Sequence, residues 1–197
     1  MTKIFSKKYS ANNVYSSLRL AAGAQLSTSP NPSVGCILLT ASRNILGQGH
    51  TQHAGGPHAD IMALRDAAAK GHDVRGVTAY VTLEPLRPPR PHRPVLRRPH
   101  RRRHQKIIAT NTDPNPLEAG QGFARMRAAG VEVLVLPPDD PLAIASRELN
   151  IGFFSRMIRK TPWVRMKMAA SPDGVTALPN GASQWITSLE ARADGHA

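Results

Sequence analysis

The stretch Gly55-Gly56-Pro57-His58-Ala59-Asp60-Ile61-Met62-Ala63-Leu64 decides both the fold and the chemistry of this chain. A Gly-Gly-Pro turn leads into a run with helical apolar spacing, which predicts a helix from His58 to about Lys70. His58 and Asp60 then lie in its first turn, beside the same pocket. An imidazole can bind a metal and a carboxylate can carry protons, so this spacing favours a catalytic site.

The rest of the chain alternates between strands and helices. Apolar patterns predict further helices at 10–26, 120–129 and 141–158, and strands at 34–39, 45–50, 77–83, 107–110, 131–136 and 163–168. Strands that alternate with helices indicate an α/β fold, here a three-layer αβα sandwich with a mixed sheet.

Composition limits the classes of protein. The net charge of +13 suggests nucleic acid as a partner, but residues 86–104 hold eight of the 26 basic residues and no acid. The basic charge is therefore mainly a property of one segment, and nucleic acid is an unlikely partner. No apolar run is long enough to span a membrane, and residues 1–13 lack the apolar core of an export signal. A single cysteine, Cys36, fits a cytoplasmic location.

The segment 86–104 is unusual because it holds eight Arg, five Pro and three His. It reads as a disordered basic loop or as a nucleic-acid-binding arm. A third interpretation is that GC-rich codons are read one base out of frame between two compensating slips. Shifting a plausible codon set by one base turns 97–103 into Asp-Ala-Leu-Ile-Ala-Ala-Gly, an apolar helix with a terminal Gly, and places Cys at 86 and 95.

Six short motifs follow one another along the chain, at residues 28–32, 54–59, 80–85, 113–116, 150–157 and 183–187. Together and in this order they resemble the bifunctional riboflavin-biosynthesis deaminase/reductase family, and the resemblance covers about 10–85 and 105–197. It implies a cytidine-deaminase-like domain that hydrolyses the ring amine of 2,5-diamino-6-ribosylamino-4(3H)-pyrimidinone 5′-phosphate. A reductase domain, similar to dihydrofolate reductase, would follow and use NADPH.

The resemblance also assigns residues to roles. His58 corresponds to a zinc ligand, and Asp60 stands where the family has the proton-carrying Glu. Asn31, Asp113 and Asn115 correspond to contacts with the substrate's ribose and phosphate.

Three features depart from the family pattern. Leu86 and Val95 occupy the positions of the two zinc-ligand cysteines, so we expect weak or no zinc binding and negligible deaminase activity. Asp60 is one methylene shorter than Glu. Most of the reductase domain is missing from the sequence.

We expect residues 10–158 to form the deaminase domain and 159–197 to be the N-terminal fragment of the reductase. In that fragment Ala170 and Trp185 match cofactor-contacting positions, and Ser183 matches a substrate-contacting position. The expected partner is a small pyrimidine ribosyl phosphate, with a possible homo-oligomer and no membrane.

Two other functions remain open. One is a deaminase of nucleic acid of the tRNA type, and the other is a catalytically inactive product of a damaged gene.

Overall fold

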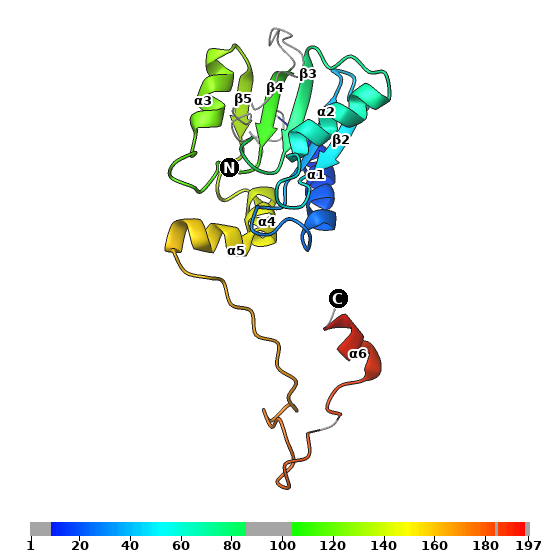
Figure 1. Ribbon diagram of the computed structural model, residues 1–197, viewed down its shortest axis with the longest axis vertical. Helices are drawn as coiled ribbons and strands as arrows, with labels where there is room; N and C mark the ends of the chain where they lie inside the picture. Colours follow the sequence, from blue (N-terminus) through cyan, green and yellow to red (C-terminus); the bar gives the residue numbers. More distant parts are fainter. Residues whose placement is uncertain (1–8, 86–103, 184, 196–197) are drawn as a thin grey trace. The chain divides into compact units, whose positions relative to one another are not determined.

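A mixed sheet of five strands organises the first part of the chain (Figure 1). The computed structural model describes residues 9–85, 104–183 and 185–195. Its strands are β1 (Gly35–Leu39), β2 (Ile45–His50), β3 (Val77–Val81), β4 (His104–Ala109) and β5 (Glu132–Val135), in the order β2-β1-β3-β4-β5. β1 is antiparallel to both β2 and β3, whereas β3, β4 and β5 are parallel to one another. The predicted mixed α/β sheet is confirmed.

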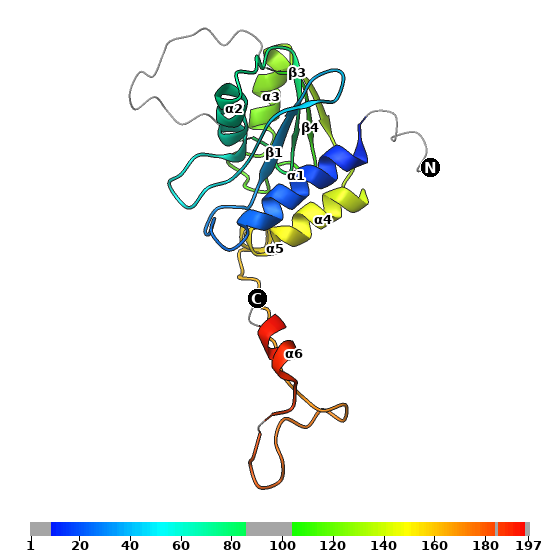
Figure 2. The same cartoon turned by 90° about the vertical axis from the view of Figure 1, so that its right-hand side faces the viewer.

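Helices cover both faces of this sheet (Figure 2). α2 (Ala59–Ala69) and α3 (Gln121–Ala128) pack on one face, and α1 (Ala11–Ala24) and α4 (Pro141–Leu149) pack side by side on the other. The side chains of β1 divide accordingly. Cys36 and Leu38 join the cluster under α2 and α3, while Ile37 and Leu39 join the cluster under α1 and α4. This period-2 alternation, with both faces buried, is why β1 is a continuous apolar run.

α2 lies unusually close to β2. A Cβ atom built on Gly47 would lie 2.3 Å from the backbone oxygen of Ala63, and one on Gly49 would lie 2.5 Å from the backbone nitrogen of the same residue. Ala63 and Ala67 are fully buried in this contact. The two glycines and the small residues of α2 therefore let the helix backbone approach the strand directly.

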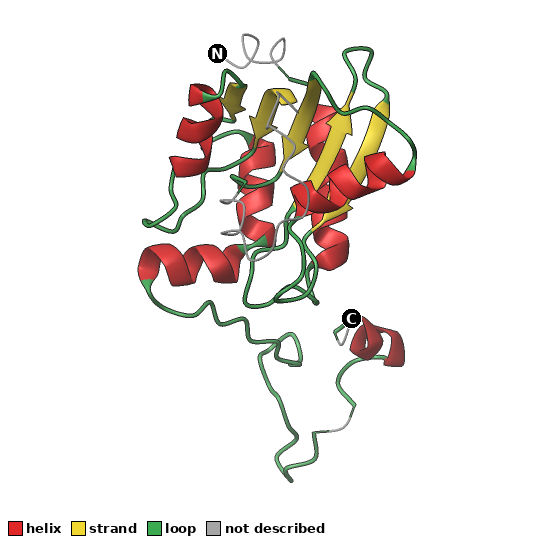
Figure 3. Cartoon of the chain, turned by 45° about the horizontal axis from the view of Figure 1, so that its top comes forward, coloured by secondary structure: helices red, strands yellow, loops and turns green. Residues whose placement is uncertain are grey.

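The predicted helix at 141–158 is divided into three segments. Figure 3 colours the helices of the chain red and its strands yellow. α4 is followed by α5 (Ile151–Phe154) and by the π-helix η2 (Ser155–Arg159), which ends at Lys160 with a positive φ of 61°. Asp140 caps α4 by accepting a hydrogen bond from the amide nitrogen of Leu142 at 2.9 Å.

Residues 163–195 form a second compact unit. The strand predicted at 163–168 is wrong, since no described residue of this unit belongs to a strand. Alternation alone does not make a strand, because backbone groups need a neighbouring strand to bond. The unit contains two turns, at Ser171–Val175 and Leu178–Ala182, and the short helix α6 (Leu189–Asp194). Among the described residues of the whole chain, no helix has the length and apolar character needed to cross a bilayer.

The close approach of α2 to β2 gives a prediction for Gly47→Ala. The new methyl group must displace helix backbone, so we expect the free energy of unfolding to fall by about 1–3 kcal/mol in urea titrations. The control is Gly23→Ala, on the exposed face of α1, where an added Cβ meets nothing within 4 Å. That change should stabilise the protein by about 0.5–1 kcal/mol, because alanine favours helix. Equal effects of the two substitutions would contradict this packing.

Candidate active site

The candidate site is a pocket at one edge of the sheet. The carboxyl ends of β2 and β3 and the amino end of β1 meet there, as their pairing requires. The space in and above the pocket is about 440 Å³, part of which is open solvent. It is lined by Asn31, Pro32, Val34, Thr51, His58, Ala59, Asp60, Val81, Leu83, Glu84 and Pro85. Open α/β sheets commonly bind ligands beyond the carboxyl ends of their strands.

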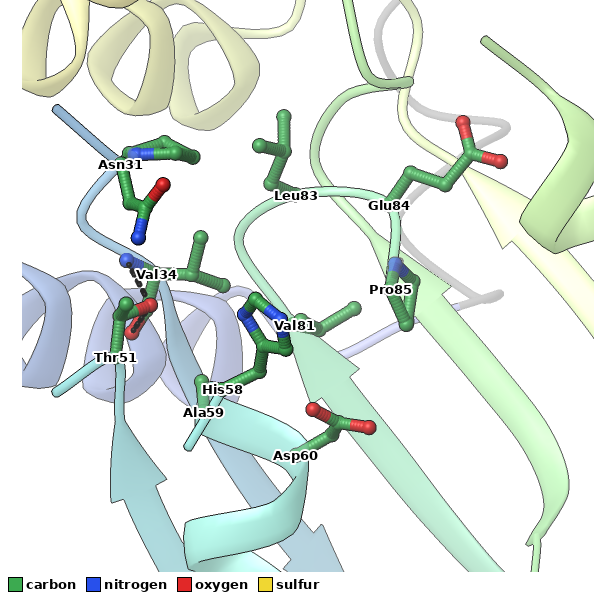
Figure 4. Close-up of a pocket in the computed structure, with 11 residues that line it drawn as sticks. Asn31, Val34, Thr51, His58, Ala59, Asp60, Val81, Leu83, Glu84 and Pro85 are labelled. Atoms are coloured by element: carbon green, nitrogen blue, oxygen red, sulfur yellow. Dashed lines mark hydrogen bonds between the residues drawn. The ribbon is translucent and has the colours of Figure 1, made fainter. Parts of the chain in front are cut away.

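His58 and Asp60 share this pocket, as the sequence predicted (Figure 4). His58 is the N-cap residue of α2, with extended backbone at φ −73° and ψ 163°, and its side chain makes no capping hydrogen bond. Asp60 lies in the first turn of the helix, where the helix dipole favours a carboxylate. Both side chains project from the start of α2 into the cavity, and Asn31 faces them from the loop before β1. An imidazole, a carboxylate and an amide thus converge on one space.

The loop that carries Asn31 is held by side chains from other elements. The amide nitrogen of Val34 donates to the hydroxyl oxygen of Thr51 at 3.2 Å (Figure 4). The amide nitrogen of Gly35 donates to the hydroxyl of Thr82 at 3.1 Å. Both threonines are buried, so these bonds fix the entry of the chain into β1.

Glu84 fixes the opposite wall of the pocket. It is only 3% exposed, and its carboxylate is directed away from His58. One oxygen accepts from the amide nitrogens of Asp113 at 3.1 Å and Gly120 at 2.8 Å, and the other accepts from Phe123 at 3.1 Å. The first turn of α3 approaches so closely that a Cβ on Gly122 would lie 3.0 Å from the Glu84 carboxylate.

No separate role for Glu84 is predicted from the sequence. It stands in the quoted motif at 80–85, but its partners lie 29 to 39 residues further along the chain. The available signal was an acidic residue directly after a buried strand, and the sequence alone does not identify what it binds.

Asp113 and Asn115 lie beside the pocket and are not among the residues that line it. Asp113 is 3% exposed. Its carboxylate accepts from the amide nitrogen of Asn115 at 2.8 Å, and the side chain of Asn115 accepts from Leu117 at 3.2 Å. Burial raises the pKa of Asp113. The hydrogen bond from Asn115 opposes this shift, and the charges of Glu84 and Glu118 add to it. The predicted substrate-contacting role of both residues remains a prediction.

The described residues do not fit a catalytic zinc ion. Such a site needs three protein ligands, and no group of three His, Cys, Asp or Glu side chains comes together within 9–85, 104–183 and 185–195. His58 is one suitable ligand, and the carboxylate of Glu84 is taken up by three amide groups. Cys36 lies in the apolar cluster under α2. Positions 86 and 95 lie outside the described residues, and the side chains of Leu86 and Val95 have no atom that could bind a metal.

The remaining predicted site residues lie in the second unit. Ser183 is exposed and Ala170 is half-buried. Trp185 is 70% exposed, and the guanidinium of Arg192 stacks over its ring at 4.0 Å. Residue 184, between Ser183 and Trp185, is outside the described part of the chain.

Comparison with known proteins places this pocket in a family. Residues 10–86 match the cytidine and deoxycytidylate deaminase zinc-binding region. The riboflavin biosynthesis protein RibD of Escherichia coli (strain K12) is 40% identical over 177 residues, which is 90% of this chain and 46% of that protein.

Two solved structures agree with the sequence match. Acinetobacter baumannii RibD has a TM-score of 0.75 at 35% identity, over 93% of this chain and 49% of that chain. The deaminase/reductase of Thermotoga maritima has a TM-score of 0.75 at 29% identity, over 94% and 52%.

Residues 10–86 therefore belong to a cytidine-deaminase-like zinc-binding region, and this region contains His58 and Asp60. Over about 90% of its length, the chain is similar to RibD riboflavin-biosynthesis proteins. It spans about half the length of the curated relatives it matches.

The role of Glu84 predicts a large effect of Glu84→Ala. Three amide groups lose their acceptor inside the protein, and each buried unsatisfied donor costs about 1–3 kcal/mol. We expect a loss of roughly 3–5 kcal/mol in the free energy of unfolding, measured by urea titration. Glu132→Ala is the matched control, because that side chain is 65% exposed and forms a surface ion pair with Lys106. It should cost less than about 1 kcal/mol, and similar costs for the two variants would refute the anchoring role.

The raised pKa of Asp113 predicts how stability depends on pH. The folded protein holds the Asp113 proton more tightly than the unfolded chain does, so this group lowers stability as pH rises above its ordinary pKa of 3.8. Asp113→Asn should therefore be more stable than the unaltered protein at pH 7, with the difference shrinking as pH falls toward 3.8.

Urea titrations between pH 4 and pH 8 would test this, with Asp139→Asn as a control for the change in net charge. A stability difference that grows on acidification would contradict the assignment.

Proposed function

We propose that this chain provides the deaminase part of a riboflavin-biosynthesis protein. The reaction is the hydrolytic deamination of 2,5-diamino-6-ribosylamino-4(3H)-pyrimidinone 5′-phosphate to 5-amino-6-(5-phosphoribosylamino)uracil and ammonia. The observation that carries the proposal is the placement of His58 and Asp60 together in one pocket at the start of α2. Support comes from the match of this region to the deaminase zinc-binding family.

The pocket suits one planar ring with polar edges. Ligand pockets commonly combine apolar walls with a few polar groups that fix the ligand's orientation. Val34, Val81 and Leu83 supply apolar walls for the faces of a pyrimidine. Asn31 can both donate and accept hydrogen bonds at the ring edge or the ribose. Asp113 and Asn115, beside the pocket, are proposed to contact the ribose and phosphate.

Asp60 is proposed to move the proton. A carboxylate at this position can accept a proton from the attacking water and pass it to the leaving amine. Its side chain is one methylene shorter than the family's Glu, so it reaches less far into the cavity. A misplacement of about 1 Å can cost on the order of a hundredfold in rate.

The sequence as it stands limits this chemistry. Hydrolysis in this family depends on zinc, which activates the water when it is bound. His58 alone does not make the site, and Leu86 and Val95 replace the other two family ligands. We therefore propose that the chain binds the pyrimidine ribosyl phosphate and turns it over negligibly.

Residues 159–197 are proposed to be the N-terminal fragment of an NADPH-dependent reductase. In this proposal Ala170 and Trp185 contact the cofactor, and Ser183 contacts the substrate. Trp185 has the exposed aromatic face that a nucleotide could cover. The chain spans about half the length of its relatives. In this proposal, a complete reductase site also needs residues from the part of those relatives that the chain does not match.

Restoring the zinc ligands tests the proposed function. Leu86→Cys and Val95→Cys, combined with Asp60→Glu and Asp-Ala-Leu-Ile-Ala-Ala-Gly at 97–103, should give about one zinc per chain by elemental analysis. Ammonia release from the diaminopyrimidine should then appear.

The control adds His58→Ala to the restored chain and should lose both zinc and activity. One zinc per chain in the unaltered protein would overturn the ligand assignment. A restored chain that binds zinc without releasing ammonia would overturn the proposed substrate.

A further inference from the structure

We propose that Asn150 is a positioning residue of the substrate pocket, which it serves by holding the loop that presents Asn31. The inference rests on the proposed function for the identity of the ligand. The claim that Asn150 holds this loop rests only on hydrogen bonds in the structure. Asn150 ends α4 on the sheet face opposite α2, so it belongs to a different layer from His58 and Asp60.

The amide of Asn150 bonds both backbone groups of Ser33. Its carbonyl oxygen accepts from the amide nitrogen of Ser33 at 2.7 Å, and its nitrogen donates to the carbonyl oxygen of Ser33 at 2.9 Å. The same nitrogen lies 3.3 Å from the carbonyl oxygen of Ser146. Ser33 is 2% exposed and Asn150 is 6% exposed. Asn150 therefore pairs with the loop in the way that a neighbouring strand would.

The loop needs such a partner. Pro30 and Pro32 have no amide hydrogen, so the loop forms few backbone bonds of its own before β1 begins. The turn is closed by the bond from the amide nitrogen of Asn31 to the carbonyl of Thr28 at 2.9 Å. Ser33 is the first residue after Pro32 with an amide hydrogen. Its pairing with Asn150 sets the direction in which the chain leaves Asn31, which is the loop's polar side chain in the pocket.

Asn150 is itself held firmly in place. Ser146, one turn earlier on α4, donates to the backbone oxygen of Thr82 at 2.7 Å and receives a bond from Thr110 at 2.9 Å. Arg147 donates to the side chain of Asn111 at 2.9 Å. These contacts tie α4 to the carboxyl ends of β3 and β4. The position of Asn150 is thus fixed relative to the same sheet edge that carries the pocket.

The chemistry of the contact is specific to an amide. Donation to one backbone group and acceptance from another require the oxygen and the nitrogen of one side chain. Asn150→Asp keeps the acceptor for Ser33 and replaces the donor with an oxygen facing the Ser33 carbonyl. Asn150→Ala removes both partners. The two variants should weaken the hold on the loop without touching the pocket.

The first experiment follows hydrogen exchange of the unaltered protein and the two variants. The Ser33 amide is expected to exchange about ten times faster or more in Asn150→Asp and Asn150→Ala, because it depends on the Asn150 bond. Amides of β3 and β4 should keep their protection. Asn12→Ala, on the exposed start of α1, is the matched control and should change neither. Exchange that rises equally throughout the domain would overturn the proposal, because Asn150 would then act only on global stability.

The second experiment is a double-mutant cycle read by calorimetric binding of 5-amino-6-(5-phosphoribosylamino)uracil. Asn31→Ala and Asn150→Asp should each weaken binding about tenfold, and the double variant should be little weaker than either one. Val77→Ala, a core truncation at the amino end of β3, controls for destabilisation and should leave affinity within about twofold. Independent, multiplying losses would overturn the link between Asn150 and Asn31.

The two experiments also separate the inference from the proposed function. If the unaltered protein does not bind the product, the proposed ligand is wrong, and hydrogen exchange at Ser33 still decides whether Asn150 holds the loop.

Discussion

The close packing of α2 against β2 is the constraint on which the candidate site depends. Gly47 and Gly49 remove the side chains that would separate the helix from the strand, and Ala63 fills the contact with a single methyl group. Two backbones this close have few alternative positions, because a shift along the helix would bring a larger side chain against the strand. The start of α2 is thereby fixed at the sheet edge, and His58 and Asp60 are fixed with it.

The loops around the pocket are held by buried polar side chains. These side chains bond the loop backbone in place of a neighbouring strand. Thr51, Thr82, Glu84 and Asn150 all accept bonds from backbone amides in the loops around the pocket. An unpaired buried amide costs about 1–3 kcal/mol, so each loop has a strong preference for the one conformation in which its amides are paired. The pocket can therefore be preorganised although part of its wall is made of loops. These residues fix the shape of the site, and Thr51 and Glu84 also line it.

The sequence predicted the elements of the sheet domain better than it predicted the connections between them. The apolar patterns placed β2 correctly and α2 to within one residue of its observed bounds. They succeeded because an element that buries one face must repeat apolar residues with the period of a strand or a helix. The expected strand at 163–168 failed because alternation describes one strand and says nothing of a partner. Glu84 and Asn150 stood within motifs quoted from the sequence, but their bonds span 36 and 117 residues. Ser146 and Asn150 do lie one helical turn apart on the buried face of α4, which was a usable sign of a polar contact.

The residues that hold the shape of the pocket differ from the residues that would bind a catalytic zinc ion. Catalytic zinc needs three protein ligands, and in the proposed function the short motif at His58 supplies one of them together with the acid that carries the proton. In the described part of the chain, the loops around the pocket are held by hydrogen bonds between protein groups. The pocket wall opposite His58, for example, is held by Glu84. The carboxylate of Glu84 accepts hydrogen bonds from three backbone amides and needs no metal. Under the proposed function, Leu86 and Val95 remove the means to activate water while Asn31, His58 and Asp60 stay in the pocket. On that proposal, binding of the pyrimidine and its hydrolysis rest on different residues, and a change in one need not abolish the other.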